Sequence, residues 1–344
     1  MSQSRKEVWN MLSKDRLIEG KIVNIEPESP WYIKLLLSIS GWVGAFFLIL
    51  FVGSFFGLIF SRYSKSIYPL LLFMGGWLIY FTYNSFKEKQ SDFLEHFMLA
   101  LSITGQVMVV ASLIFMFENI LERGVLLIIT IFQAFLMWRI PNYIHRLMTS
   151  FFMASSLSYF FYTVGEPFVP TMILTFVVAW LWMNEFNFAE RKKIEAIAYG
   201  QTVALLSVKY SLSVVLGYSQ IVPIFASILT LIYVIWMILK ESRDSYDKEN
   251  LSLIIGAVAL LSLLSFQVGG LVLGVMLLLV GFAHSHRLLI GLGIFSSLSF
   301  LSYYYYYLGD TLMDKAGVLA LMGMAILLSR WAINMVLQKE ASDV

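Results

Sequence analysis

Apolar residues form long runs along this chain, separated by short polar stretches. The first run, Leu35–Phe60, carries no charge and exceeds the ~20 residues that a helix needs to cross a bilayer core. The pattern predicts an all-α polytopic membrane protein, with about 12 transmembrane helices in one bundle. The further runs are Tyr68–Asn84, Phe97–Met116, Gly124–Trp138, Leu147–Thr163, Phe168–Met183, Ile194–Gly217, Ile221–Leu239, Leu251–Phe266, Val268–Ala283, Leu288–Tyr307 and Ala316–Ser329.

Several of these runs are at or below the ~17 residues usual for a spanning helix. Extension into their aromatic flanks, or a thin bilayer, would let them cross the membrane. The alternative is that two short segments pair as a re-entrant hairpin. Val268–Ala283 and its neighbour are the segments to which this alternative applies best.

Lys and Arg are concentrated on one side of the predicted membrane. Arg62, Lys65, Arg123 and Lys315 fall in outside loops and Lys209 within a span, and the rest of the 24 fall in segments assigned to the cytoplasm. Cytoplasmic loops carry the excess of Lys and Arg in membrane proteins. The asymmetry therefore supports the number of spans and predicts that both termini are cytoplasmic.

The spans divide the chain into a cytoplasmic N-terminal segment 1–34, a transmembrane helical domain 35–337 and a cytoplasmic tail 338–344. Within the first segment, Val8–Ile18 has apolar residues at helical spacing. This pattern fits a short amphipathic helix and, equally, a loosely ordered tail. The polar residues before the first run, and the length of that run, argue against a cleavable signal peptide.

Composition agrees with a chain that faces lipid. The 344 residues are 59% hydrophobic and 13% charged, whereas soluble domains are about 25% charged. A net charge of +2 is too small to indicate nucleic-acid binding. Cysteine is absent, which excludes disulfides and cysteine nucleophiles. No P-loop, H-E-x-x-H or G-x-S-x-G motif is present, so the sequence indicates no enzyme class and no cofactor.

Small residues at helical spacing suggest where helices pack closely, as they do in membrane bundles. Gly53 and Gly57 form a G-x-x-x-G pair in the first span. Gly270 and Gly274 form another in the tenth, and Gly281 continues the same face. Packing within one bundle is the favoured interpretation of these pairs, and a dedicated dimer face is the alternative.

Lys209 is the one Lys or Arg within a predicted span. Ionisable groups inside a membrane are costly and often functional, so Lys209 is a candidate for solute binding or ion coupling. It shares a helical stripe with Glu195, a second candidate. The favoured structural alternative is that Lys209 extends toward the outer end of its span, Gly217, and reaches the interface there.

A polar stripe runs along the third predicted span. Glu95, Ser102 and Gln106 lie on one face, and Gln106 is near mid-membrane. This face could bind a small polar solute or relay protons, but an interhelical hydrogen bond from Gln106 is the favoured interpretation. Gln133 and Gln201 invite the same pair of interpretations.

Asp310 and Asp314 follow a run of tyrosines. If the last helix begins near Thr311, Asp310 is its N-cap and Asp314 lies in its first turn, where negative charge suits the helix dipole. The functional alternative is a cation-attracting outer vestibule. The histidine pair in His284-Ser-His286 lacks further convergent ligands, so no metal site is predicted.

Polar and aromatic landmarks recur in three stretches of the chain. They are residues 29–53, with Pro30-Trp31-Tyr32, residues 93–106, which end in Gly105-Gln106, and residues 281–331, with Arg287, the tyrosine run and Lys315. Together these stretches resemble the bacterial multi-pass membrane proteins grouped as domain of unknown function 4401. Ala316 departs from the serine expected in that family, at a position with no assigned role.

The resemblance implies a bacterial inner-membrane protein. Members of the family are often encoded beside another multi-pass protein of unknown function and a membrane-anchored protein with a Gly-Asp-Tyr motif, which implies a complex. The resemblance supplies no substrate and no catalytic residue.

Two functions remain open on the sequence. The first is a subunit or scaffold of a membrane or envelope complex, with the lipid bilayer and membrane proteins encoded nearby as its partners. The second is a carrier or channel for a small solute or ion, which predicts that Lys209, Gln106 and Glu95 converge on one internal cavity. A membrane enzyme is less favoured, because no catalytic pair is evident.

Overall fold

The computed structural model describes residues 30–60, 67–86, 92–117, 122–216, 221–241 and 268–307, with parts of 255–266 and 311–327. This part of the chain contains helices and no strand, which confirms the all-α prediction for the described residues. Val8–Ile18, Asp310 and the tail 338–344 lie outside the described residues.

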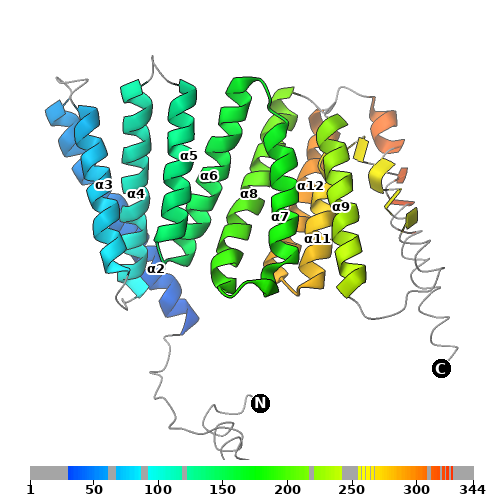
Figure 1. Cartoon of the computed structure of the whole chain (residues 1–344), viewed down its shortest axis with the longest axis horizontal. Helices are drawn as coiled ribbons and strands as arrows, with labels where there is room; N and C mark the ends of the chain where they lie inside the picture. The colour runs from blue at the N-terminus through cyan, green and yellow to red at the C-terminus, as the bar shows by residue number, and fades with distance from the viewer. Residues whose placement is uncertain are drawn as a thin grey trace, which may run out of the picture.

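The helices follow the predicted apolar runs closely (Figure 1). Several of them, α4 above all, begin a few residues earlier than their runs, because backbone hydrogen bonding continues into polar residues at the helix end. The described elements are α2 (Trp31–Phe60), α3 (Ile67–Ser85), α4 (Asp92–Phe117), α5 (Glu122–Arg139), α6 (Tyr143–Val164), α7 (Val169–Met183), the 3₁₀ turn η1 (Glu185–Asn187), α8 (Arg191–Leu216), α9 (Ile221–Glu241), α11 (Leu271–Ala283) and α12 (Arg287–Tyr307).

These helices form an elongated row, which corrects the expectation of one bundle (Figure 1). Helices that follow one another in sequence are mostly neighbours: α3 packs on α4, α5 on α6, and α11 on α12. Helix α8 packs against α6 and α7, and α9 packs against α7 and α11. Short connections favour antiparallel contact between consecutive helices, and a chain of such contacts extends the array in one direction.

Glycines allow the closest approaches between helices. Gly75 of α3 lies against Gly105 of α4, so that a Cβ added to Gly75 would come within 2.6 Å of the Gly105 carbonyl oxygen. Gly200 of α8 lies against the Leu147 carbonyl oxygen and Ser150 of α6 in the same way. These contacts replace side-chain packing with backbone packing, as expected for helices that associate through small residues.

The predicted glycine pairs have different environments. Gly274 and Gly281 both pack against α12, which places them at a contact within the chain. Gly270 precedes α11 with a positive φ of 113°, and a Cβ there would meet the Phe300 ring. Gly53, by contrast, has no described atom within 4 Å of an added Cβ, and Gly57 is outside the residues whose surroundings are described.

The main hydrophobic core lies among α6, α7, α8, α9, α11 and α12, around the fully buried Trp182. A smaller core joins α3, α4 and the end of α5 through Ile79, Val109, Leu136 and Ile140. The two cores share no residue. Within the smaller core, α4 and α5 make few contacts with each other. The sparse contact between α4 and α5 leaves room for the cavity discussed below.

Some of the described helices are compatible with crossing a membrane. By length and composition, three of them in the described part could do so: Phe93–Phe117, Ile221–Lys240 and Arg287–Tyr306. Shorter apolar stretches are Leu35–Phe51, which lies within α2, together with Val169–Met183 and Leu271–Ala283. The last has 13 residues and is about 20 Å long at 1.5 Å per residue, so the re-entrant alternative for this segment stays open.

Candidate functional site

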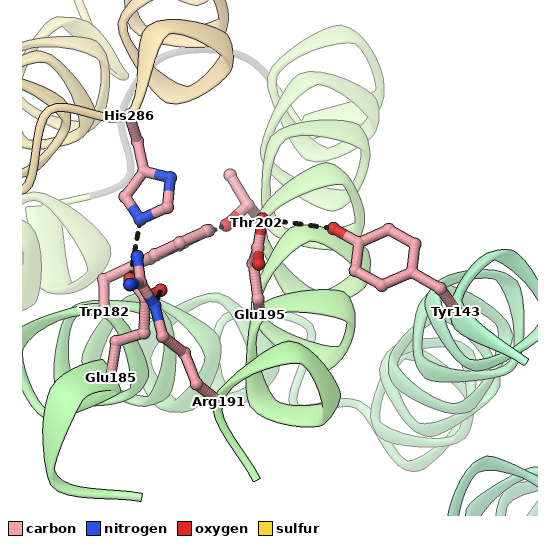
Figure 2. Close-up of polar contacts among 7 residues, drawn as sticks. All are labelled: Tyr143, Trp182, Glu185, Arg191, Glu195, Thr202 and His286. Atoms are coloured by element: carbon pink, nitrogen blue, oxygen red, sulfur yellow. Dashed lines mark hydrogen bonds and ion pairs between the residues drawn. The ribbon is translucent and has the colours of Figure 1, made fainter. Parts of the chain in front are cut away.

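A buried carboxylate lies in the connection between α7 and α8. Helix α7 ends at Met183, and the 3₁₀ turn that follows directs Glu185 into the protein, where its side chain is 0% exposed. Arg191 Nε donates to Glu185 Oε1 at 2.6 Å, and His286 Nε2 lies 2.7 Å from Glu185 Oε2 (Figure 2). We call Glu185, Arg191 and His286 the Glu185 cluster.

The Glu185 cluster joins segments that are far apart in the sequence. His286 lies in the turn between α11 and α12, where Ser285 adopts a positive φ of 58°. The His286 ring contacts the Trp182 ring edge-on, with centroids 5.0 Å apart. Trp182 Nε1 in turn donates to Thr202 Oγ1 of α8 at 3.0 Å (Figure 2). The cluster therefore ties the α7–α8 connection to the α11–α12 turn.

Charge complementarity accounts for the burial of Glu185, since an unpaired buried carboxylate would be costly. Arg191 precedes the predicted span 194–217 and is half exposed. Its hydrogen bond with Glu185 raises its pKa above the usual value, and the nearby carboxylate charges add to this effect. Both Glu185 oxygens have partners, and no group of three or more metal-ligating side chains gathers in the described part of the chain.

A second polar cluster joins α4 to the start of α6. His145 is fully buried, and its Nε2 lies 2.9 Å from Ser102 Oγ and 2.7 Å from Gln106 Nε2. Asn142 caps α6 by accepting from the His145 backbone N–H, and its Nδ2 donates to Glu95 Oε1 at 2.9 Å. The polar stripe of α4 thus faces α6, and we call these five residues the His145 cluster.

Hydrogen bonding in the His145 cluster is incomplete. An amide N–H of Gln106 donates to the ring, so Nε2 of His145 acts as the acceptor. Gln106 Oε1 and His145 Nδ1 are both buried and have no hydrogen-bond partner among the described residues. Gln133 Oε1 of α5 is likewise buried and has no hydrogen-bond partner among the described residues. Buried polar groups are nearly always satisfied, so this concentration of unsatisfied atoms marks the region as a candidate site.

The remaining predicted residues lie apart from these clusters. Lys209 is 2% exposed in α8, so its side chain does not extend to the surface as the favoured alternative required. Glu195 accepts from Tyr143 Oη at 3.5 Å, at the edge of hydrogen-bonding range (Figure 2). Asp314 lies in a first helical turn, where its backbone N–H donates to Thr311 Oγ1, so Thr311 is the N-cap there.

The sequence indicates only the α4 side of the His145 cluster, through Glu95, Ser102 and Gln106, and none of the Glu185 cluster. Glu185 and Arg191 belong to an ordinary polar connection, and His286 lies in a histidine pair for which the sequence predicts no metal site. His145 carries no local signal in the sequence that distinguishes it. The pairing of Glu185 with His286 spans 101 positions in the chain, so no local pattern signals it.

In the part of the chain that the structure describes, the fold and the two clusters define an all-helical, largely apolar array whose buried polar residues connect helices. Residues 30–336 match the family described as a domain of unknown function (DUF4401), so the chain belongs to that family, as its landmarks suggested. No curated protein and no solved structure matches the chain.

Proposed function

We propose that the chain is a multi-pass protein of the bacterial inner membrane, with twelve spans and both termini in the cytoplasm. Its outer faces support this placement, because large apolar side chains on several helices are exposed. Phe73 of α3, Ile131 of α5 and Leu229 of α9 are 73%, 68% and 66% exposed. Soluble monomers rarely expose extended apolar surface, whereas a bilayer would cover it.

Contacts between connecting segments support the proposed topology. Four predicted spans separate the connection 184–193 from the turn 284–287, so alternation places both on the same side. The Glu185–His286 contact joins these two segments, and both connections are at the lower end of the row in Figure 1. Lys193 also lies over the Trp138 ring, 4.0 Å from its centroid, which brings the end of α5 to the same level.

We propose further that the protein acts as a structural subunit of a membrane or envelope complex. The observation that carries this proposal is the elongated row of helices (Figure 1), several of which expose large apolar side chains to lipid or partner helices. Hydrogen bonds in the buried polar clusters connect neighbouring helices and their connections along this row. Such an array suits lateral association more than enclosure of a central pathway.

The carrier or channel alternative has less support. It requires Lys209, Gln106 and Glu95 to meet at one cavity. Gln106 lines a cavity beside α4, but neither Lys209 nor Glu95 belongs to its lining. Lys209 is also absent from the lining of a second cavity, between α8 and α12.

Purification from native membranes tests the proposed role. The tagged protein, expressed at its native level and extracted in a mild detergent, should elute with a membrane protein at constant stoichiometry. An unrelated polytopic protein with the same tag serves as the control for adventitious association. If the protein elutes alone in several detergents, the subunit proposal is wrong. Flux assays in liposomes, with Lys209→Ala as a comparison, would then address the carrier alternative.

A further inference from the structure

A cavity of about 410 Å³ lies among α4, α5 and α6. This volume falls within the ~300–1,000 Å³ typical of small-molecule sites. Its lining is largely apolar and includes Leu126 and Ile129 of α5 and Phe152 of α6. Val107 and Tyr159, also in the lining, are 58% and 52% exposed, so the cavity opens toward the side of the helix row.

Two buried amides contribute to this cavity from different helices. Gln106 of α4 and Gln133 of α5 both belong to its lining, and each is 2% exposed. In the described part of the chain, the Oε1 atom of each amide lacks a hydrogen-bond partner. A buried acceptor without a partner is unfavourable. Two such acceptors at one cavity indicate a missing donor.

One further polar side chain of the lining is already hydrogen-bonded within the protein. Ser156, also in the lining, donates to the Met153 carbonyl oxygen and lies 2.9 Å from Thr130 Oγ1. Its hydroxyl is therefore already engaged. Among the described residues, the lining contains no Asp, Glu, Lys, Arg or His, so no described side chain there would balance a charged ligand.

From these features we propose that the cavity binds an uncharged, single-chain alcohol. Its apolar chain would occupy the space between α4 and α5, and its hydroxyl would donate to Gln106 or Gln133. A carboxylate would bring no hydrogen to the two amide oxygens and would meet no positively charged side chain among the described lining residues. A hydrocarbon would leave both amide oxygens unsatisfied. Entry of the alcohol from the bilayer through the side of the helix row rests on the proposed membrane placement. The hydrogen-bonding argument for an alcohol does not depend on that placement.

Photolabelling of the purified protein in nanodiscs tests the proposal. The probe is a 1-hexadecanol derivative with a diazirine in its chain, and labelled peptides are mapped by mass spectrometry. The label should map to α4, α5 and α6. Labelling mainly at other helices would overturn the proposal.

Competition on the wild-type protein tests the role of the hydroxyl. Dodecan-1-ol, dodecane and dodecanoate are compared at equal mole fractions in the bilayer. Differences in their partitioning into lipid then do not determine how strongly each compound competes. A hydrogen bond to a buried amide predicts that the alcohol competes about tenfold better than the hydrocarbon. Equal competition by dodecane, or stronger competition by dodecanoate, would contradict the proposed ligand class.

Variants test the roles of the two amides and of the cavity volume. Gln106→Leu and Gln133→Leu should each weaken alcohol competition about threefold to tenfold. Ala111→Trp, which fills the cavity, should abolish labelling of α4–α6. Gln201→Leu is the matched control, because Gln201 is a buried amide that bonds to Ser150 outside the cavity. If the control weakens competition as much as the other two, the amides have no specific role.

Failure of this proposal is distinguishable from failure of the proposed function. Labelling in nanodiscs needs no partner protein, so a negative result leaves the subunit role unaffected. Conversely, a protein that purifies alone can still bind the alcohol.

Discussion

Two adjacent glycines of α3 provide a matched test of the helix packing. A Cβ at Gly75 would lie 2.6 Å from the Gly105 carbonyl oxygen of α4 and 3.0 Å from Met108 Cβ. A Cβ at Gly76 would meet no described atom within 4 Å. Gly75→Ala and Gly76→Ala therefore add the same methyl group to the same helix, one at a tight contact and one at an open face.

The two substitutions share one energetic effect and differ in another. Replacing Gly by Ala within a helix stabilises it by about 0.8–1 kcal/mol, and this gain applies to both variants. Overpacking at a close contact costs about 1–3 kcal/mol, and this cost applies only to Gly75→Ala. We therefore expect Gly76→Ala to be stabilising and Gly75→Ala to be less stable than Gly76→Ala by about 1–3 kcal/mol.

Unfolding free energies measured in mixed micelles check this difference. Gly105→Ala, whose Cβ would lie 2.7 Å from the Gly75 carbonyl oxygen, should resemble Gly75→Ala. The double variant should lose less than the sum of the two, because both methyl groups separate the same helices. Equal stabilities of Gly75→Ala and Gly76→Ala would refute the close packing of α3 on α4.

Two further predictions concern the buried side chains around η1. Glu185→Gln removes the charge from two hydrogen bonds and should lower the unfolding free energy by about 2 kcal/mol, whereas Glu195→Gln should change it by less than about 0.5 kcal/mol. Similar losses in denaturant titrations of both variants would count against the Glu185 cluster. Trp182→Phe deletes the donor to Thr202 and part of a fully buried ring, and should cost about 1–3 kcal/mol. Trp180→Phe, at a residue 41% exposed, is its control and should cost less in the same assay.

The helices could be predicted from the sequence because apolar runs mark them directly. Helix α7 was expected at Phe168–Met183 and occurs at Val169–Met183. Helix α4 was expected from Phe97 and begins at Asp92, since hydrophobicity marks the apolar part of a helix and not its capped end. The arrangement of helices in a row was not predictable, because it depends on which neighbours each apolar face selects.

The candidate sites were predictable only in part. Helical spacing correctly grouped Glu95, Ser102 and Gln106 on one face of α4, since the period of a helix determines which side chains align. Their partner, His145, follows from how α6 packs on α4, and a single sequence does not contain that information. The unsatisfied oxygen of Gln133 likewise depends on the cavity between helices.

Membrane topology is the central claim, and cysteine accessibility tests it most directly. The chain contains no cysteine, so single residues can be introduced without background. Glu166 is exposed in the connection after α6, and Lys192 is exposed at the start of α8, at the end that carries the Glu185 cluster. We predict that an impermeant maleimide labels Glu166→Cys in intact spheroplasts and labels Lys192→Cys only after permeabilisation. The reverse pattern, or labelling of both residues in intact spheroplasts, would contradict the proposed membrane topology.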